Sequence, residues 1–95
     1  MREFEFGSVV YSTAGHDKGS FFLVIDVQDE YLVLADGRLR TIEHPKQKKI
    51  KHVQSQNHRC ERLLEAKEAS RRITNEMIKF ELKEYQRKIQ GGLYV

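Results

Sequence analysis

Residues 7–53 hold five short β-type segments, and this density of strands constrains the fold more than any other feature of the sequence. Each segment is rich in β-branched, aromatic or alternating apolar residues, and turn signals such as Asp36 and Gly37 separate them. The predicted strands cover residues 7–12, 21–25, 31–35, 39–42 and 50–53. Strands this short cannot protect a flat sheet, whereas a small barrel buries their apolar side chains and removes exposed edges. The sequence therefore predicts a small five-stranded barrel within residues 1–54.

The chain after residue 54 is rich in Glu, Lys, Arg, Leu and Ala, which favour helices. An apolar stripe at helical spacing consists of Ile78, Leu82, Tyr85 and Ile89. Thr74 and Asn75 supply an N-cap signal before the stripe, and the glycine pair at 91 and 92 should end the helix. We expect residues 55–95 to form a charged helical tail that packs on the barrel or extends from it. The predicted class is mainly β with a helical tail, or α+β.

The number of helices in the tail stays open at this level. A shorter helix around Cys60, Leu63 and Leu64 is one prediction, and a single helix over residues 57–89 is the other. Phe80 lies opposite the apolar stripe on a helical wheel. It is interpreted as a surface aromatic or as packing on the upstream helix, with contact to RNA or a protein partner as the alternative. The stripe itself could also drive homodimerisation.

Length and composition restrict the compartment. Ninety-five residues suit one ordinary domain. No run approaches the roughly 20 apolar residues that a membrane span needs, and the acidic residues among the first five argue against a secretory signal. The single cysteine, Cys60, cannot form an intramolecular disulfide, which fits a reducing compartment. We therefore expect a cytoplasmic protein with no membrane partner.

Charge is segregated along the predicted barrel. An acidic stretch over residues 26–36 precedes a basic segment that contains Arg38, Arg40, Lys46, Lys48, Lys49 and Lys51. The net charge of +3 is small, but the separation of sign predicts one strongly positive edge. Alternation along the predicted strand 39–42 would turn Arg38 and Arg40 away from the core, opposite Leu39. Such an edge suits phosphate groups of a nucleic acid, and a solvated basic loop is the alternative.

A glycine-bounded loop, Gly15-His16-Asp17-Lys18-Gly19, joins the first two predicted strands. The two glycines permit a sharp excursion with exposed backbone N–H groups, which can approach phosphate closely. Lys18 would add a positive charge at the tip of this loop. The alternative is a tight turn with Lys18 in solvent. We expect Asp17 to order the loop by accepting hydrogen bonds from nearby N–H groups.

The loop and its flanking strands resemble the KOW motif, in which a strand leads through a G-x-D-K-G loop into a second apolar strand. The resemblance extends to the Ala-Asp-Gly-Arg-Leu-Arg run at 35–40 and the basic segment at 43–52. Over residues 7–54 the chain is similar to the large-subunit ribosomal protein fourteen-e family, and most of all to its short bacterial relatives; residues 73–78 resemble the tail of that bacterial group. This resemblance implies an SH3-like KOW barrel whose loop lies against RNA.

The aromatic residues of the predicted strands are divided between core and surface. Phe22 is assigned to the core together with Val24, because aromatic residues in short strands are commonly buried. For Tyr11, Phe21 and Tyr31 two interpretations stay open: they pack in the core, or one or two of them lie at the surface and stack on bases.

Catalysis and metal binding are not indicated. His52, His58 and Cys60 do not match the paired spacings of a structural zinc site, and neither a nucleophile–base pair nor a phosphate-binding Walker loop occurs. We therefore expect no enzyme activity, no cofactor and no small-molecule substrate.

The predicted function is non-catalytic RNA binding, with ribosomal RNA or the ribosome as partner and a ribosomal protein contacted through the tail. The predicted RNA-binding residues are Gly15, His16, Lys18, Gly19, Arg38, Arg40, Lys46, Lys48, Lys49 and Lys51. The alternative is a protein-interaction module that docks on ribosomal or transcription proteins, as the KOW barrels of NusG-type factors do. A protein-docking barrel would need an exposed apolar patch where this chain has its basic segment.

Overall fold

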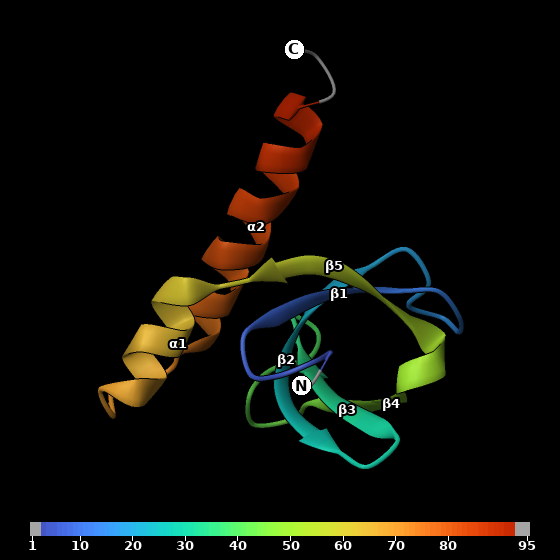
Figure 1. The fold of residues 1–95 in the computed structure, drawn as a ribbon, viewed down its shortest axis with the longest axis horizontal. Coiled ribbons are helices and arrows are strands. Elements are labelled where there is room, and N and C mark those ends of the chain that lie inside the picture. The colour runs from blue at the N-terminus through green and yellow to red at the C-terminus, as the bar shows by residue number, and fades with distance from the viewer. Residues whose placement is uncertain (1–2, 93–95) are drawn as a thin grey trace.

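Five antiparallel strands and two C-terminal helices make up this chain, whose computed structural model describes residues 3–92 (Figure 1). The strands are β1 (Ser8–Ser12), β2 (Phe21–Gln28), β3 (Tyr31–Ala35), β4 (Lys46–Lys49) and β5 (Val53–Arg59). A 3-10 helix, η1 (Ile50–His52), lies between β4 and β5, and the helices α1 (Glu61–Glu68) and α2 (Asn75–Gly92) follow. The predicted α+β class is confirmed.

The sheet bends so that its two edge strands approach each other at one end. Its order is β4-β3-β2-β1-β5, and every neighbouring pair is antiparallel. The edge strands β4 and β5 are joined by only the three residues of η1, so their connected ends lie within the short reach of that segment. Irregular register between Val24 and Asp26 in β2, and between Ser8 and Val10 in β1, bends the strands locally.

Both faces of the sheet are buried. One face carries a core made of Phe4, Val10, Phe22, Val24, Leu32 and Leu34. The opposite face packs under the helices, in a second core made of Val9, Leu23, Ala35, Cys60, Leu63, Ile78, Leu82 and Tyr85. Successive residues of a strand point to opposite faces, so the nearly continuous apolar run at the start of β2 serves both cores. The assignment of Phe22 and Val24 to the core is confirmed.

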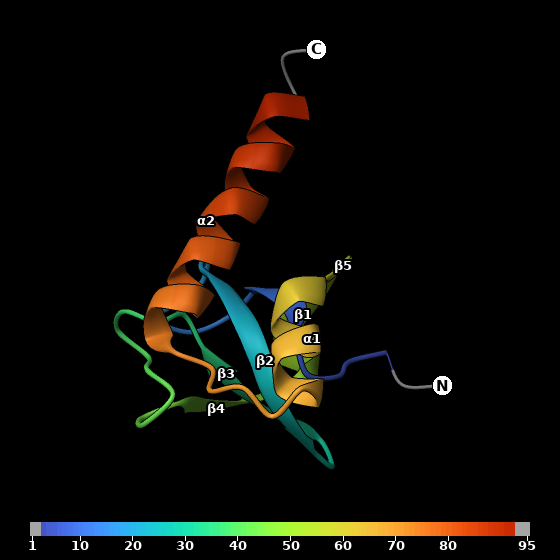
Figure 2. The same cartoon turned by 90° about the vertical axis from the view of Figure 1, so that its left-hand side faces the viewer.

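The helical tail is part of the fold's core and consists of two helices. Figure 2 shows α1 and α2 on the same side of the sheet, joined by the segment after α1. Ser70 in that segment has a φ of 58°, and Thr74 caps α2 by accepting a hydrogen bond of 3.2 Å from the Met77 N–H. The expectation of a separate upstream helix is confirmed, and a single helix over residues 57–89 is wrong.

The apolar stripe of α2 is buried only over its first part. Ile78, Leu82 and Tyr85 lie in the helix-covered core, whereas Ile89 is 39% exposed. The C-terminal turns of α2 extend beyond the sheet in both views (Figures 1 and 2). The helix also includes the glycines at 91 and 92, which the sequence predicted to end it. Within residues 3–92, no helix combines the length and apolarity that a membrane span requires.

Two predicted strands are placed wrongly by the sequence. Residues 39–42 form no strand, because the Asp36 carboxylate accepts hydrogen bonds from the N–H groups of Arg38 (2.8 Å) and Arg40 (2.9 Å) and holds them in a turn. The fourth strand is instead the lysine-rich β4, directly after Pro45. An edge strand tolerates lysines on its solvent side. The last strand begins at Val53 and continues to Arg59, five residues beyond the predicted boundary at 54.

Candidate nucleic-acid interface

The 15–19 loop between β1 and β2 is closed by its own backbone. Gly15 and Gly19 have φ angles of 87° and 94°, which only glycine adopts without strain. The Lys18 N–H donates to the Gly15 carbonyl at 3.1 Å, and the Gly19 N–H donates to the Ser12 carbonyl at 2.9 Å. These two N–H groups are therefore engaged within the loop and are not offered to phosphate. The side chains of His16 and Lys18 are exposed.

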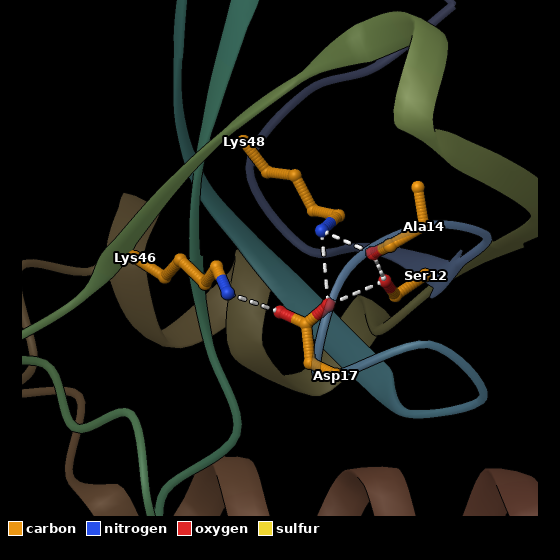
Figure 3. A network of polar contacts seen from close by, with 5 residues as sticks. All are labelled: Ser12, Ala14, Asp17, Lys46 and Lys48. Atoms are coloured by element: carbon orange, nitrogen blue, oxygen red, sulfur yellow. Dashed lines mark hydrogen bonds and ion pairs between the residues drawn. The ribbon is translucent and has the colours of Figure 1, made fainter.

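The Asp17 carboxylate ties this loop to β4 (Figure 3). Its Oδ1 accepts hydrogen bonds from the Ser12 hydroxyl at 2.7 Å and from the Lys48 ammonium at 2.9 Å. Its Oδ2 pairs with the Lys46 ammonium at 2.6 Å. The Lys48 ammonium also donates to the Ala14 carbonyl at 2.7 Å. We call Ser12, Asp17, Lys46 and Lys48 the Asp17 cluster. The sequence predicted that Asp17 would accept hydrogen bonds from N–H groups of its own loop, but its carboxylate instead binds two lysines of a distant strand.

The charge state of Asp17 follows from these contacts. Burial by itself would raise the pKa of the carboxyl group, but the hydrogen bonds from Lys46, Ser12 and Lys48 outweigh burial and hold its pKa well below the ordinary value of 3.8. Asp17 is therefore ionised under all physiological conditions, and its negative charge neutralises part of the charge of two lysines.

Two of the predicted RNA-binding lysines consequently serve the fold. Lys48 is 8% exposed, because its side chain passes under the 15–19 loop to reach Asp17. The prediction that Lys48 lies on an exposed basic edge is wrong. Its ammonium lies so close to the loop that a Cβ at Gly15 would stand 3.3 Å from it. The Lys46 side chain is 24% exposed and is held by the same carboxylate. The sequence does not reveal this pairing, since Asp17 and Lys48 are far apart along the chain.

The 36–44 loop carries Arg38 and Arg40 and is docked on the first turn of α2. Gly37 lies so close to this turn that a Cβ at its position would stand 2.3 Å from the Asn75 carbonyl oxygen. The Ile42 N–H donates to the Asn75 side chain at 2.8 Å, and the Asn75 amide donates to Glu43 at 2.9 Å, which lowers the pKa of Glu43. The helix therefore holds the backbone of the loop that carries both arginines.

Arg38 and Arg40 are exposed, as predicted, but for a different reason. They lie in a loop, and Leu39 between them is 80% exposed instead of facing the core. Alternation along a strand therefore does not apply to this segment. Leu39 is the one large hydrophobic residue in the range 38–52 that is exposed to this extent.

Lys49 and Lys51 lie at a different place from the two arginines. They border a shallow hollow beside the turn between β2 and β3, together with Asp29, Glu30 and Ile50. The Ile50 N–H donates to the Glu30 carbonyl at 2.8 Å, which fixes this arrangement. The single basic edge expected from the sequence is therefore divided between the Asp17 cluster, the 36–44 loop and this acid-containing corner.

A groove of about 740 Å³ brings the 15–19 loop and the 36–44 loop to the same site. We call it the α2 groove, because α2 forms its third wall. Its lining residues are Gly19, Ser20, Phe21, Asp36, Arg38, Lys79, Leu82, Lys83, Gln86, Arg87 and Gln90. Two of the predicted RNA-binding residues, Gly19 and Arg38, meet here although they are distant in sequence. The α2 cations Lys79, Lys83 and Arg87, which recur at helical spacing, were not among the residues predicted to bind RNA.

The aromatic residues form a packed row rather than an open stacking platform. The ring of Phe21 lies 5.0 Å from that of Tyr11 and 5.8 Å from that of Tyr85, in edge-to-face contacts. The ring of His58, in β5, lies 4.8 Å from that of Tyr85. Of Tyr11, Phe21 and Tyr31, which the sequence left between core and surface, Tyr31 is the one that is exposed. Packing therefore occupies Tyr11 and Phe21.

Phe80 is a partly exposed aromatic residue that lies beside α1. The residue is 49% exposed, and its ring lies 5.8 Å from the guanidinium carbon of Arg62.

Cys60 is buried directly before α1. Burial, followed by the charges of Glu81 and Glu61, raises the pKa of its thiol to about 12. A thiol with such a pKa stays protonated and unreactive. Among residues 3–92, no three potential metal ligands of the His, Cys, Asp or Glu type come together.

Neither a known family model nor a curated protein matches this chain in sequence.

Proposed function

We propose that this protein binds structured RNA without catalysis, and that its sheet is an SH3-like barrel of the KOW type. The observation that carries the proposal is the α2 groove. Gly19, at the end of the KOW-like loop, and Arg38, in the Ala-Asp-Gly-Arg-Leu-Arg run, both line it. These are the two segments in which the sequence resembles the ribosomal protein fourteen-e family. The proposed partner is ribosomal RNA, in the cytoplasm.

The chemistry of the exposed segments supports RNA over a protein partner. Lys18, Arg38 and Arg40 extend from loops whose backbones are held by hydrogen bonds, so little backbone freedom is lost when they bind. Arginine can both pair with phosphate and stack on an unpaired base. A protein-docking surface in the range 38–52 would need an apolar patch, and Leu39 alone does not make one.

Binding to labelled fragments of ribosomal RNA at several salt concentrations tests this proposal. Affinity should fall steeply between about 50 and 200 mM salt, because each phosphate neutralised releases counterions. Co-sedimentation with ribosomal subunits at low and high salt tests the cellular partner. Absence of RNA binding at low salt, or an affinity independent of salt, would refute the proposal.

A protein partner is the second candidate, and one observation favours it. Phe80 borders a hollow between α1 and α2 that also contains Leu63, Ala66 and Met77. This hollow lies on a different side of α2 from the groove, and a ribosomal protein docked there would leave the RNA site open. Substitution of Phe80 by Ala should then weaken ribosome association without changing affinity for isolated RNA; an equal loss in both assays would argue against a separate protein site.

A further inference from the structure

The helix α2 presents a row of cations to the groove. Lys79, Lys83 and Arg87 are each four residues apart, and all three line the groove. Residues four apart on a helix lie on one face and are displaced by about 6 Å along the axis. This repeat is similar to the distance between neighbouring phosphates of a single nucleic-acid strand. Arg38 of the 36–44 loop lines the same groove.

The groove differs in charge from four other hollows of the described surface. Its lining contains the four cations Arg38, Lys79, Lys83 and Arg87 and a single carboxylate, Asp36. The hollow between α1 and α2 contains three glutamates and two arginines, and the hollow beside Lys49 balances two lysines with two carboxylates. Two further hollows contain more carboxylates than cations. Of these five hollows, only the α2 groove is positive.

The cations of the row are available for an anionic ligand. Lys79 pairs with Glu76 at 3.0 Å and Arg87 with Glu84 at 3.1 Å, but these are exposed pairs within one helix, which contribute little and exchange readily. Lys83 is exposed and takes part in none of the ion pairs found among residues 3–92. The Asp36 carboxylate is engaged by two backbone N–H groups of its own loop, which reduces its repulsion of a phosphate.

We propose that α2 is a wall of the RNA site, and that one RNA strand runs along the groove with its phosphates on Lys79, Lys83 and Arg87. This inference rests on the proposed RNA-binding function and extends it to the tail, which the sequence assigned to a protein contact. Contacts of this kind position the RNA without reading its sequence, since phosphates are alike at every nucleotide. The helix has a double role, because its buried stripe completes the core while the adjacent face holds the strand.

The test compares two double variants with the parent protein in binding to labelled ribosomal RNA fragments. Lys83→Ala with Arg87→Ala removes two phosphate contacts, so the slope of log affinity against log salt should become shallower by about 1.4, at about 0.7 for each contact to a single strand. A shallower slope also means that the loss of affinity relative to the parent should be largest at the lowest salt concentration. Lys83→Arg with Arg87→Lys keeps both charges and should retain the parent slope. Circular dichroism establishes that each variant is folded.

Lys88→Ala is the matched control, because Lys88 is an exposed lysine of the same helix outside the groove lining. It should leave affinity and slope close to those of the parent. Lys83→Ala alone disturbs none of the ion pairs described and should change the slope by half as much as the double alanine variant does. This single variant keeps the test decisive if the double variant unfolds. Equal slopes for the parent, the double alanine variant and Lys88→Ala would overturn the inference. A parent protein that binds no RNA would instead refute the proposed function.

Discussion

Replacement of Asp17 by Asn tests the role of the Asp17 cluster in holding the 15–19 loop. The change keeps the shape of the side chain and an oxygen that can accept from Ser12, but it removes the charge that neutralises Lys46 and Lys48. Lys48 is almost fully buried and would be left with uncharged acceptors alone, the Ala14 carbonyl and the amide oxygen of the new Asn. Removing one partner of a buried ion pair costs about 3–5 kcal/mol, and because Lys46 is partly exposed we expect about 2–3 kcal/mol here.

Urea unfolding followed by circular dichroism measures this difference. The matched control is Asp26→Asn, because Asp26 is an exposed aspartate that contacts Val27 and Gln28 but no lysine. The double variant Asp17→Asn with Lys48→Met should recover much of the lost stability, because it removes the buried cation that the single variant leaves uncompensated. Equal urea midpoints for the parent and Asp17→Asn would refute the assignment of Lys48 to the fold.

The same cluster predicts a pH dependence. The pKa of Asp17 is lowered in the folded protein relative to its ordinary value of 3.8, so the folded state favours the ionised carboxylate. The stability that it contributes is fully present above the unfolded pKa and is lost as pH falls below about 4 toward the folded pKa. The parent should therefore lose more stability on acidification than Asp17→Asn does. Parallel curves of unfolding free energy against pH for the two proteins would contradict this.

Two further substitutions concern the 36–44 loop. Gly37→Ala places a Cβ 2.3 Å from the Asn75 carbonyl at a positive φ of 81°, so thermal unfolding should show a loss of about 2–4 kcal/mol; an unchanged melting temperature would mean that the loop is not docked on α2. Arg38→Ala with Arg40→Ala should leave the fold intact and weaken RNA binding by about 2–4 kcal/mol, if each arginine contributes as much as a good bidentate contact. Charge removal at Lys49 and Lys51, which lie beside two carboxylates, should weaken it less, and the reverse order would move the RNA site to that corner.

Local sequence patterns determined much of the secondary structure. The strands β2 and β3, the positive φ at Gly37 and the buried stripe of α2 all follow from propensities within a few neighbouring residues. The cap at Thr74 is equally local, because it joins residues three apart. These features need no knowledge of what lies across the sheet. The exposure of Lys18 also follows from its place in a short loop.

The division of labour among the basic residues was decided by tertiary structure alone. Lys48 and Lys49 are neighbours with the same chemistry, yet strand pairing turns Lys48 under the 15–19 loop toward Asp17 and leaves Lys49 exposed. Residues 39–42 have an alternating pattern, but docking of Gly37 on α2 and the bonds of Asp36 keep them from pairing as a strand. The α2 groove likewise exists only because the helix packs across the sheet beside two loops. Contacts between residues far apart in the chain depend on the complete packing, and no local pattern encodes them.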